Sequence, residues 1–417
     1  MLFRTLGVVL LSAAMMAQVP SASTIKFEDA TAAAGIGFTH SFGSAKLGSL
    51  LEGTGGGCVW FDYNNDGKPD LYVVSGRPLE DGMHPYPLKQ KPVDPPHNHL
   101  YRNDGNGKFT DVSEKSGISA VVGRTMGVAA ADFDGDGYPD IYVANDRTEN
   151  FLFHNKKDGT FEEIAVDAGV AYGQNGESTS AMGPVFADIE GNGLLDLWVT
   201  DAKYNRLMKN QGNKTFEDIG RASGISPITA QYTSWGTGIY DFDNDGQLDI
   251  LTFHGGLIHL VPEEHSVYRG LGGAKFADVS RQAGPVFDVK TVARGACFGD
   301  YDNDGKLDAF VVNLGAPARL LHNASTGGGH WITVQLKGTK SNRDGIGARL
   351  EVTAGLKKQI AERVAGSGYL SQDDGRVHFG LGAATKVERL TVKWPSGKVQ
   401  VLEDMAVDRV VMVEEPK

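Results

Sequence analysis

One acidic nonapeptide occurs five times in this chain of 417 residues, and it constrains the fold more than any other feature. Each copy carries an oxygen-bearing side chain at positions 1, 3, 5 and 9 and a glycine at position 6. The starts are separated by 70, 56, 53 and 59 residues, and each copy lies between two short apolar runs. This arrangement is typical of a loop that joins two strands. The copies are DYNNDGKPD at Asp62, DFDGDGYPD at Asp132, DIEGNGLLD at Asp188, DFDNDGQLD at Asp241 and DYDNDGKLD at Asp300.

Oxygen ligands at this spacing around a tight glycine turn suit Ca²⁺, which takes about six to eight oxygens. An EF-hand would need a glutamate at position 12, but that position is valine or threonine in every copy. The ninth aspartate must therefore close each site, and position 7 contributes its backbone carbonyl. We predict about five calcium ions, one in each copy. The predicted ligands are Asp62, Asn64, Asp66, Lys68 and Asp70; Asp132, Asp134, Asp136, Tyr138 and Asp140; Asp188, Glu190, Asn192, Leu194 and Asp196; Asp241, Asp243, Asp245, Gln247 and Asp249; and Asp300, Asp302, Asp304, Lys306 and Asp308.

A second element, of the type KFEDATAAAGI, recurs between the loops and begins at Lys26, Lys108, Thr160, Thr215 and Lys275. One repeat then contains four antiparallel strands in about 50 to 60 residues, which is typical of a propeller blade. The first such strand, residues 27–30, precedes every loop, whereas the fifth repeat ends at residues 320–323 without one. We therefore predict that the N-terminal strand completes the last blade. The predicted fold is an all-β, five-bladed β-propeller; six or seven blades are the alternatives.

Composition and the chain start indicate where the protein acts. The formal charge of −12 argues against a nucleic-acid partner. Residues 1–23 combine Arg4, an apolar run and small residues, which predicts a cleaved signal peptide and a secreted or periplasmic protein. No later segment is apolar over enough residues to span a membrane. Signatures of common hydrolases, redox enzymes and nucleotide-binding proteins are absent from the sequence.

The repeats resemble the FG-GAP or VCBS repeats of integrin α-subunit propellers, over residues 24–325. After a glycine-rich linker, residues 330–415 contain alternating apolar runs that predict a small β-sandwich-like domain. Four of its segments resemble the ASPIC/UnbV domain: SNRDGIGARLEV, GSGYLSQ, HFGLG and VKWPSG. The combination is similar to the cartilage acidic protein family, which implies an exported, calcium-binding propeller. Five residues in these motifs are explained better by turn formation and core packing than by a ligand site: Arg343, Asp344, Arg349, His378 and Trp394.

The stretches before the inner strands of a propeller lie at one mouth of the channel, where ligands usually bind. Glu52, Arg124, Tyr232 and Arg294 are therefore candidate catalytic residues. Trp235, together with Arg124 and Arg294, is a candidate for ligand binding, because aromatic and guanidinium groups suit a sugar or an anion. The alternative is that these groups only pack against one another.

Three further sets of residues remain open. A polar group follows the second strand of three repeats, where it could form ion pairs between blades: Ser75, Arg77, Asn145, Asp146, Arg147, Asp201 and Lys203. His84, His97 and His99 lie in or beside a long proline-rich insert, and their spacing is weak evidence for a metal site. Cys58 and Cys297 either form a disulfide or are buried as apolar side chains.

These features favour an exported calcium-binding propeller that binds a protein or carbohydrate partner, with calcium mainly structural. The alternative is a calcium-dependent lyase, cyclase or isomerase whose pocket is the channel mouth. The sequence identifies neither the ligand nor the oligomeric state.

Overall fold

The computed structural model describes residues 24–29, 58–74, 97–105, 108–257 and 259–417. Strands dominate these ranges, which contain one short α-helix, α2 (Ile225–Thr229), and two 3₁₀ turns, Ile118–Ala120 and Pro285–Phe287. Within the described ranges, no helix has both the length and the apolar character needed to cross a membrane. The predicted signal peptide, residues 1–23, lies outside the described residues.

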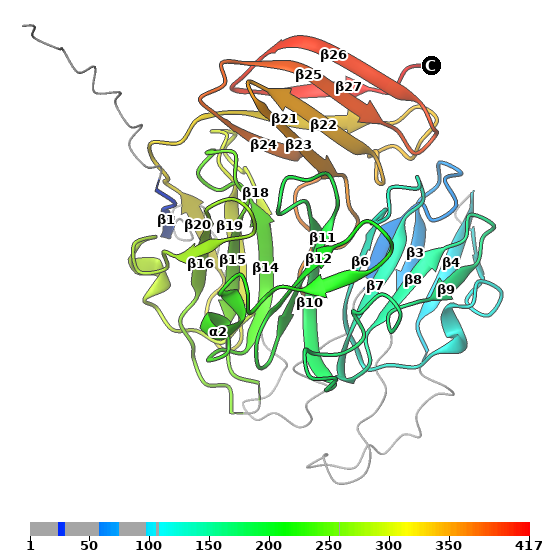
Figure 1. Cartoon of the computed structure of the whole chain (residues 1–417), viewed down its shortest axis with the longest axis horizontal. Helices are drawn as coiled ribbons and strands as arrows, with labels where there is room; N and C mark the ends of the chain where they lie inside the picture. Colours follow the sequence, from blue (N-terminus) through cyan, green and yellow to red (C-terminus); the bar gives the residue numbers. More distant parts are fainter. Residues whose placement is uncertain (1–23, 30–57, 75–96, 106–107, 258) are drawn as a thin grey trace, which may run out of the picture.

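The described strands before residue 324 form five antiparallel units of four strands, in the order that the repeats predict (Figure 1). The structure therefore confirms the β-propeller architecture, whereas the blade count of the complete chain stays a prediction. Unit 1 contains β2 (Cys58–Phe61), β3 (Asp70–Val73), β4 (His99–Gly105) and β5 (Lys108–Asp111); unit 2 contains β6 (Thr125–Ala131), β7 (Asp140–Thr148), β8 (Phe151–Asn155) and β9 (Phe161–Glu163); unit 3 contains β10 (Thr179–Ala187), β11 (Asp196–Asp201), β12 (Arg206–Asn210) and β13 (Phe216–Asp218); unit 4 contains β14 (Ser234–Tyr240), β15 (Asp249–His254), β16 (Ser266–Gly270) and β17 (Phe276–Asp278); unit 5 contains β18 (Ala293–Gly299), β19 (Asp308–Asn313) and β20 (Arg319–Asn323).

The N-terminal strand β1 (Phe27–Asp29) is the fourth strand of unit 5. It pairs antiparallel with β20, and Phe27 lies opposite Asn323. The side chain of Phe27 is fully buried, with its ring centroid 5.6 Å from those of both Phe242 and Phe287. The prediction that the chain start completes the last unit is confirmed.

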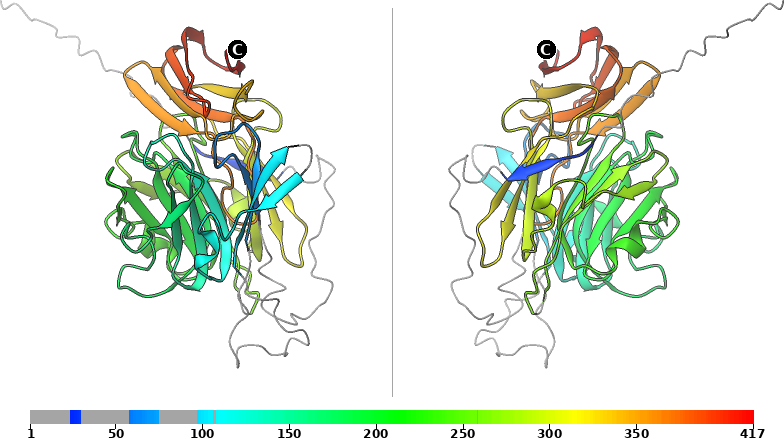
Figure 2. Two further views of the ribbon diagram at one scale, coloured as in Figure 1. Left: turned by 90° about the vertical axis from the view of Figure 1, so that its right-hand side faces the viewer. Right: turned by 90° about the vertical axis from the view of Figure 1, so that its left-hand side faces the viewer.

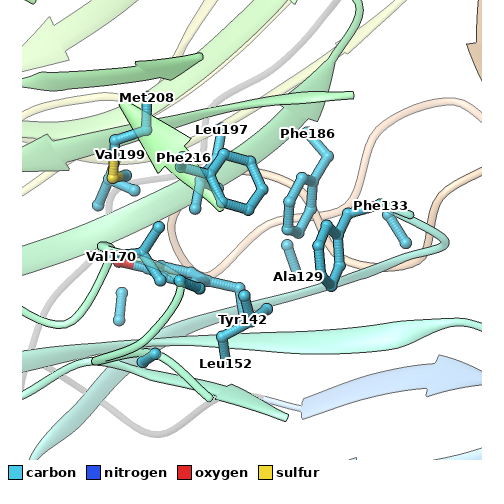
Figure 3. Packing of buried hydrophobic residues seen from close by; sticks show 14 of the residues in the cluster. Ala129, Phe133, Tyr142, Leu152, Val170, Phe186, Leu197, Val199, Met208 and Phe216 are labelled. Atoms are coloured by element: carbon cyan, nitrogen blue, oxygen red, sulfur yellow. The ribbon is translucent and has the colours of Figure 1, made fainter. Parts of the chain in front are cut away.

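Apolar clusters lie between successive units, as expected for sheets that pack face to face. One cluster joins units 2 and 3, where Phe133 and Tyr142 of unit 2 face Phe186, Leu197 and the other apolar residues of unit 3 (Figure 3). Other clusters of the described residues join units 1 and 2, units 3 and 4, and units 4 and 5. Each unit is therefore stabilised mainly by its neighbours.

The inner strands approach one another closely, and small residues make this possible. All seven residues of β6 are buried, and five of them are glycine, alanine or valine. A Cβ atom added to Gly127 would lie 1.9 Å from the carbonyl oxygen of Met182 on the next inner strand. The glycine-rich runs before the loops therefore bring neighbouring units together around the channel.

Residues after the last unit form two sheets that enclose a separate apolar core. One sheet has the order β24-β21-β27 and the other the order β23-β22-β25-β26. This confirms the predicted β-sandwich-like module, which covers one end of the propeller (Figure 2). Its strands are β21 (His330–Lys337), β22 (Arg349–Ala354), β23 (Lys357–Glu362), β24 (Val377–Gly382), β25 (Lys386–Lys393), β26 (Val399–Ala406) and β27 (Arg409–Glu414).

Removing the ring of Phe27 tests whether β1 holds unit 5 together. We expect Phe27→Ala to lower the free energy of unfolding by about 3 to 5 kcal/mol, because it leaves a cavity between two buried rings. Urea denaturation followed by tryptophan fluorescence measures this change. The matched control is Glu28→Ala on the same strand, whose side chain is exposed and pairs only with Lys26. Equal unfolding midpoints for the two variants would contradict this role of β1.

Candidate functional site

Each acidic nonapeptide forms the loop between the first two strands of a unit, and the loop closes on its first aspartate. In unit 2, Asp132 Oδ1 accepts a hydrogen bond from the amide of Asp136 at 2.9 Å, and Asp132 Oδ2 accepts one from Gly137 at 2.8 Å. The same two bonds occur in the other four loops. Gly137 has a φ of 93°, which explains the glycine at position 6.

The ninth aspartate fixes the loop to the rest of its unit. Asp70 Oδ2 accepts a hydrogen bond from the amide of Tyr63 at 3.1 Å, and Asp70 Oδ1 accepts one from Asn103 on the third strand at 2.7 Å. In unit 2, Asp140 Oδ1 accepts from Asn155 at 2.8 Å, whereas Asp140 Oδ2 is buried without a hydrogen-bond partner. An oxygen of this kind is available to a cation.

The carboxylates converge in three of the loops. One oxygen from each of three aspartates lies within 4.8 Å of the others in units 2, 4 and 5. This spacing suits oxygens that surround one Ca²⁺ at about 2.3 to 2.6 Å. In units 1 and 3 the predicted ligand sets include the amides Asn64 and Asn192. The converging aspartates are Asp132, Asp134 and Asp136; Asp241, Asp243 and Asp249; and Asp300, Asp302 and Asp308. The donor set therefore fits calcium.

A basic side chain from the third strand lies against four of the loops, and the sequence analysis missed it. His154 Nδ1 is 2.9 Å from Asp140 Oδ1 in unit 2. Lys209 and His322 pair in the same way with acidic residues of the loops in units 3 and 5. In unit 4, Arg269 Nε lies 2.9 Å from Asp243 Oδ2. The sequence does contain a pattern that marks these side chains: each directly precedes the asparagine or glycine that ends the third strand.

Asparagines at the ends of third strands connect neighbouring units. Asn155 Nδ2 donates to the carbonyl of Tyr63 in the loop of unit 1, at 2.9 Å. Asn210 donates to Phe133 of unit 2 and Asn323 to Phe242 of unit 4, both at 2.8 Å. The loops are therefore junctions between units as well as candidate metal sites.

The C-terminal domain contacts the loop of every unit. Against unit 2, both carboxylate oxygens of Glu362 accept from the amide of Asp132, at 3.1 and 3.2 Å. Against unit 4, His378 Nε2 lies 2.8 Å from Asn244 Oδ1. Against unit 5, Arg376 donates to the carbonyl of Asp300 at 2.7 Å. Arg349 donates to the carbonyl of Gly193 in unit 3, and Gly67 in unit 1 lies against the carbonyl of Lys340.

One segment of this domain, residues 363–376, enters the channel between the inner strands. Ala365 forms a β-bridge with Ala130 of β6, and the amide of Gly368 donates to the carbonyl of Pro184 of β10 at 3.0 Å. The amide of Asp374 donates to Phe298 of β18 at 2.8 Å. The buried residues Met126, Met182, Trp235 and Tyr369 pack together inside the channel. We call these four residues the plug.

The plug changes the interpretation of the candidate ligand residues. Trp235 is fully buried, its ring centroid lies 4.9 Å from that of Tyr369, and Arg294 Cζ lies 3.9 Å from its centroid. Tyr232 stacks on His254 at 4.4 Å, and Arg124 lies in unit 2. Glu52 lies outside the described residues, as do Ser75, Arg77 and His84. Trp235 and Arg294 therefore pack against each other, which is the alternative to a ligand site at the channel mouth.

The end of the channel away from the C-terminal domain contains a hollow of about 650 Å³. Units 2, 3 and 4 line it, and neither Arg124, Tyr232, Trp235 nor Arg294 is among the lining residues. Residues that do line it include Arg147, Ser178, Lys203, Leu257, His259 and Glu263. Arg147 and Lys203 belong to the polar group predicted after the second strands, so the structure brings members of that group together.

The structure also describes the surroundings of the two cysteines, of two histidines beside the proline-rich insert, and of Trp394. Cys58 and Cys297 are free thiols, and Cys58 is exposed rather than buried. His97 and His99 lie side by side, with ring centroids 4.5 Å apart. Trp394 lies in the core of the C-terminal domain and donates to Gln400 at 3.1 Å.

Comparisons with known proteins agree with this architecture. Residues 62–143, 132–199 and 188–252 match the FG-GAP-like repeat, and residues 338–417 match ASPIC and UnbV. The chain carries FG-GAP-like repeats followed by an ASPIC and UnbV domain. It is 27% identical over 369 residues, 85% of the chain, to cartilage acidic protein 1 of Homo sapiens, and 28% identical over 308 residues, 70% of the chain, to that of Xenopus tropicalis. It spans about half the length of these relatives, 52% and 44% respectively.

Two lectins are among the similar solved structures. A lectin of Agrocybe aegerita has a TM-score of 0.40 at 16% identity, over 88% of this chain and 85% of the lectin. The BP39L lectin of Burkholderia pseudomallei has a TM-score of 0.39 at 12% identity, over 84% of this chain and 95% of the lectin. At TM-scores this low, the lectins support no argument about function.

The electrostatics of the loops favour a bound cation. The pKa values of Asp70, Asp140 and Asp196 are raised to about 7, mainly by burial and to a smaller extent by nearby carboxylates. Burial also raises the pKa of Asp241 and Asp249 well above the usual range, and the neighbouring aspartates add to this shift. Calcium binds the ionised form of a carboxylate, so it must displace protons that these groups hold near neutral pH.

We therefore predict that calcium binding releases protons at pH 6.5 and releases far fewer at pH 8.5, where these carboxylates with pKa values of about 7 are already ionised. Calorimetric titrations in two buffers of different ionisation enthalpy measure the number released. The apparent calcium affinity should increase with pH over the same range. Equal proton release at the two pH values would contradict the proposed protonation of the loops.

Proposed function

We propose that this protein is an exported, calcium-binding β-propeller protein that binds a protein or carbohydrate partner, with calcium in a mainly structural role. The observation that carries the proposal is the position of the five acidic loops. Each loop lies against the C-terminal domain, whereas the opposite end of the channel has a hollow of about 650 Å³. One end of the propeller is thus a metal-binding scaffold and the other is available to a partner.

Burial of the ligands supports a structural rather than a catalytic role for calcium. The first and ninth aspartates of all five loops are at most 8% exposed. Catalysis by a metal requires a coordination position that a substrate or a water can occupy. Ligands enclosed by a hairpin and by a second domain are better suited to holding the two together.

Calcium should also hold the C-terminal domain in place. Four of its contacts use backbone atoms of the loops, including the amide of Asp132 and the carbonyl of Asp300. These atoms keep their positions only while each loop keeps its shape. Without the cation, repulsion among neighbouring carboxylates favours other loop conformations, which weakens the contacts.

The binding role is favoured over the calcium-dependent enzyme. Of the proposed catalytic residues in the described part of the chain, Arg294 is 4% exposed and stacks on Trp235. Arg124 and Tyr232 lie in units 2 and 4 and do not line the hollow. A lyase, cyclase or isomerase would need such groups around one accessible space.

Substitution of one loop aspartate tests the metal assignment. We expect Asp132→Asn to bind one calcium ion fewer than the parent protein, counted by atomic emission after gel filtration. At calcium about tenfold to a hundredfold above the dissociation constant, its free energy of unfolding should be lower by about 1.4 to 2.7 kcal/mol. In EDTA the difference from the parent protein should shrink, because neither protein then holds the ion.

The matched control is Asp158→Asn in the same unit. Asp158 is an exposed turn residue that accepts hydrogen bonds from the amide and the hydroxyl of Thr160, at 2.9 and 2.6 Å. It lies outside the nonapeptide, so its calcium count and melting temperature should match those of the parent. An unchanged calcium count in Asp132→Asn would overturn the assignment of this loop.

A further inference from the structure

We propose that the hollow at the end of the channel away from the C-terminal domain binds an acidic oligosaccharide through carboxylate groups on its sugars. This inference rests on the proposed function and specifies the chemistry of the ligand. It follows from the shape of the hollow, from two cations that neighbouring units place at its rim, and from the hydrogen-bonding groups between them.

Among the described residues, buried side chains form the inner side of the hollow. Its lining includes Ala202 and Leu257, which pack against the plug formed by Met126, Met182, Trp235 and Tyr369. Because Tyr369 enters from the C-terminal domain, the two ends of the channel are separated by buried side chains. In the part of the chain that the structure describes, the outer side of the hollow is therefore the route by which the end of an oligosaccharide would enter.

Arg147 is positioned by an irregularity in the sheet. At this end of the molecule β7 of unit 2 pairs with β10 of unit 3: Thr148 lies opposite Thr179, and Asp146 lies opposite Ser180. Arg147 is the extra residue between the two pairs, and its φ of 54° is in the left-handed region. Bulges of this kind redirect a side chain and are frequent beside functional sites. Arg147 is exposed and lines the hollow.

Lys203 supplies the second cation from the adjacent unit. The backbone around it is fixed, because the buried Asp201 accepts a hydrogen bond from the amide of Lys203 at 2.8 Å. The amide of Asp201 in turn donates to Asn205 Oδ1 at 3.0 Å. Lys203 is nevertheless an exposed residue that lines the hollow, as His259 does. These groups suit ligands with several negative charges.

The groups between the cations suit hydroxyls. Ser178 and Ser180 line one side of the hollow and offer hydroxyl donors and acceptors. On another side, Glu263 is half-buried and uses Oε2 to accept a hydrogen bond from the amide of Thr233 at 2.9 Å. A carboxylate so placed accepts hydrogen bonds from sugar hydroxyls, whereas it repels a ligand that carries only anionic groups. Cations and hydroxyl partners together point to a sugar acid.

The test uses the full chain in calcium and a panel of immobilised hexasaccharides. The acidic probe is a hyaluronan hexasaccharide, which alternates a carboxylated and a neutral sugar, and the neutral probe is a hexamer of N-acetylglucosamine. Acidic peptides of similar charge are included as competitors. We expect binding to the carboxylated probe, weakening with added salt, and about tenfold weaker binding for Lys203→Glu.

The variants separate charge from folding. Arg147→Gly removes the cation and keeps a residue that tolerates the left-handed backbone, so it should weaken binding without changing the melting temperature. Lys203→Arg should retain binding. Lys156→Glu makes the same charge change as Lys203→Glu at an exposed position on the outer edge of unit 2, and should bind normally.

The outcomes distinguish the inference from the proposed function. Preferential binding of the neutral sugar or of the acidic peptides, or equal binding by Lys203→Glu and Lys156→Glu, overturns the acidic oligosaccharide and leaves a binding protein. Absence of binding to every saccharide and to every peptide overturns the inference. If, in addition, the calcium-loaded chain retains no protein partner after cross-linking in an extract of its source organism, the proposed function is overturned as well.

Discussion

The structure depends on the confinement of several carboxylates within one nine-residue loop, where their negative charges repel one another. Backbone amides of the same loop partly compensate this charge, as the two bonds to Asp132 show. A basic side chain of the third strand compensates a further part, as Arg269 does beside Asp243. The remaining negative charge is what a divalent cation would balance, and we propose that the stability of each hairpin depends on binding such an ion.

The same loops organise the molecule at longer range. Asn155, Asn210 and Asn323 join the loops of units 1, 2 and 4 to the following unit, and contacts such as Glu362 with Asp132 join the loops to the C-terminal domain. That domain in turn places Tyr369 against Trp235 inside the channel. The candidate metal sites, the packing of successive units and the closure of one channel end are therefore parts of one arrangement. The proposed ligand site lies at the other end.

Much of this arrangement follows from sequence, and the exceptions have physical reasons. The loops and strand order are local patterns, and the role of Phe27 follows because the fifth repeat lacks its last strand. The basic side chains of the third strands were missed because the spacing within a loop says nothing about a later strand. Asn155 on such a strand follows Asp140 of its loop by 15 residues. Trp235 and Arg294 were expected at an open mouth, because no local pattern shows that residues 363–376 enter the channel. The bulge at Arg147 likewise depends on pairing between two units.

The central claim is that occupied calcium loops hold the C-terminal domain against the propeller. Hydrogen–deuterium exchange of residues 363–376, with calcium and in EDTA, tests it most directly, because the amides of Gly368 and Asp374 donate to inner strands of the propeller. The account predicts that calcium removal accelerates their exchange, while amides within β22, in the core of the C-terminal domain, remain protected. Unchanged exchange at Gly368 and Asp374 after complete calcium removal would contradict it.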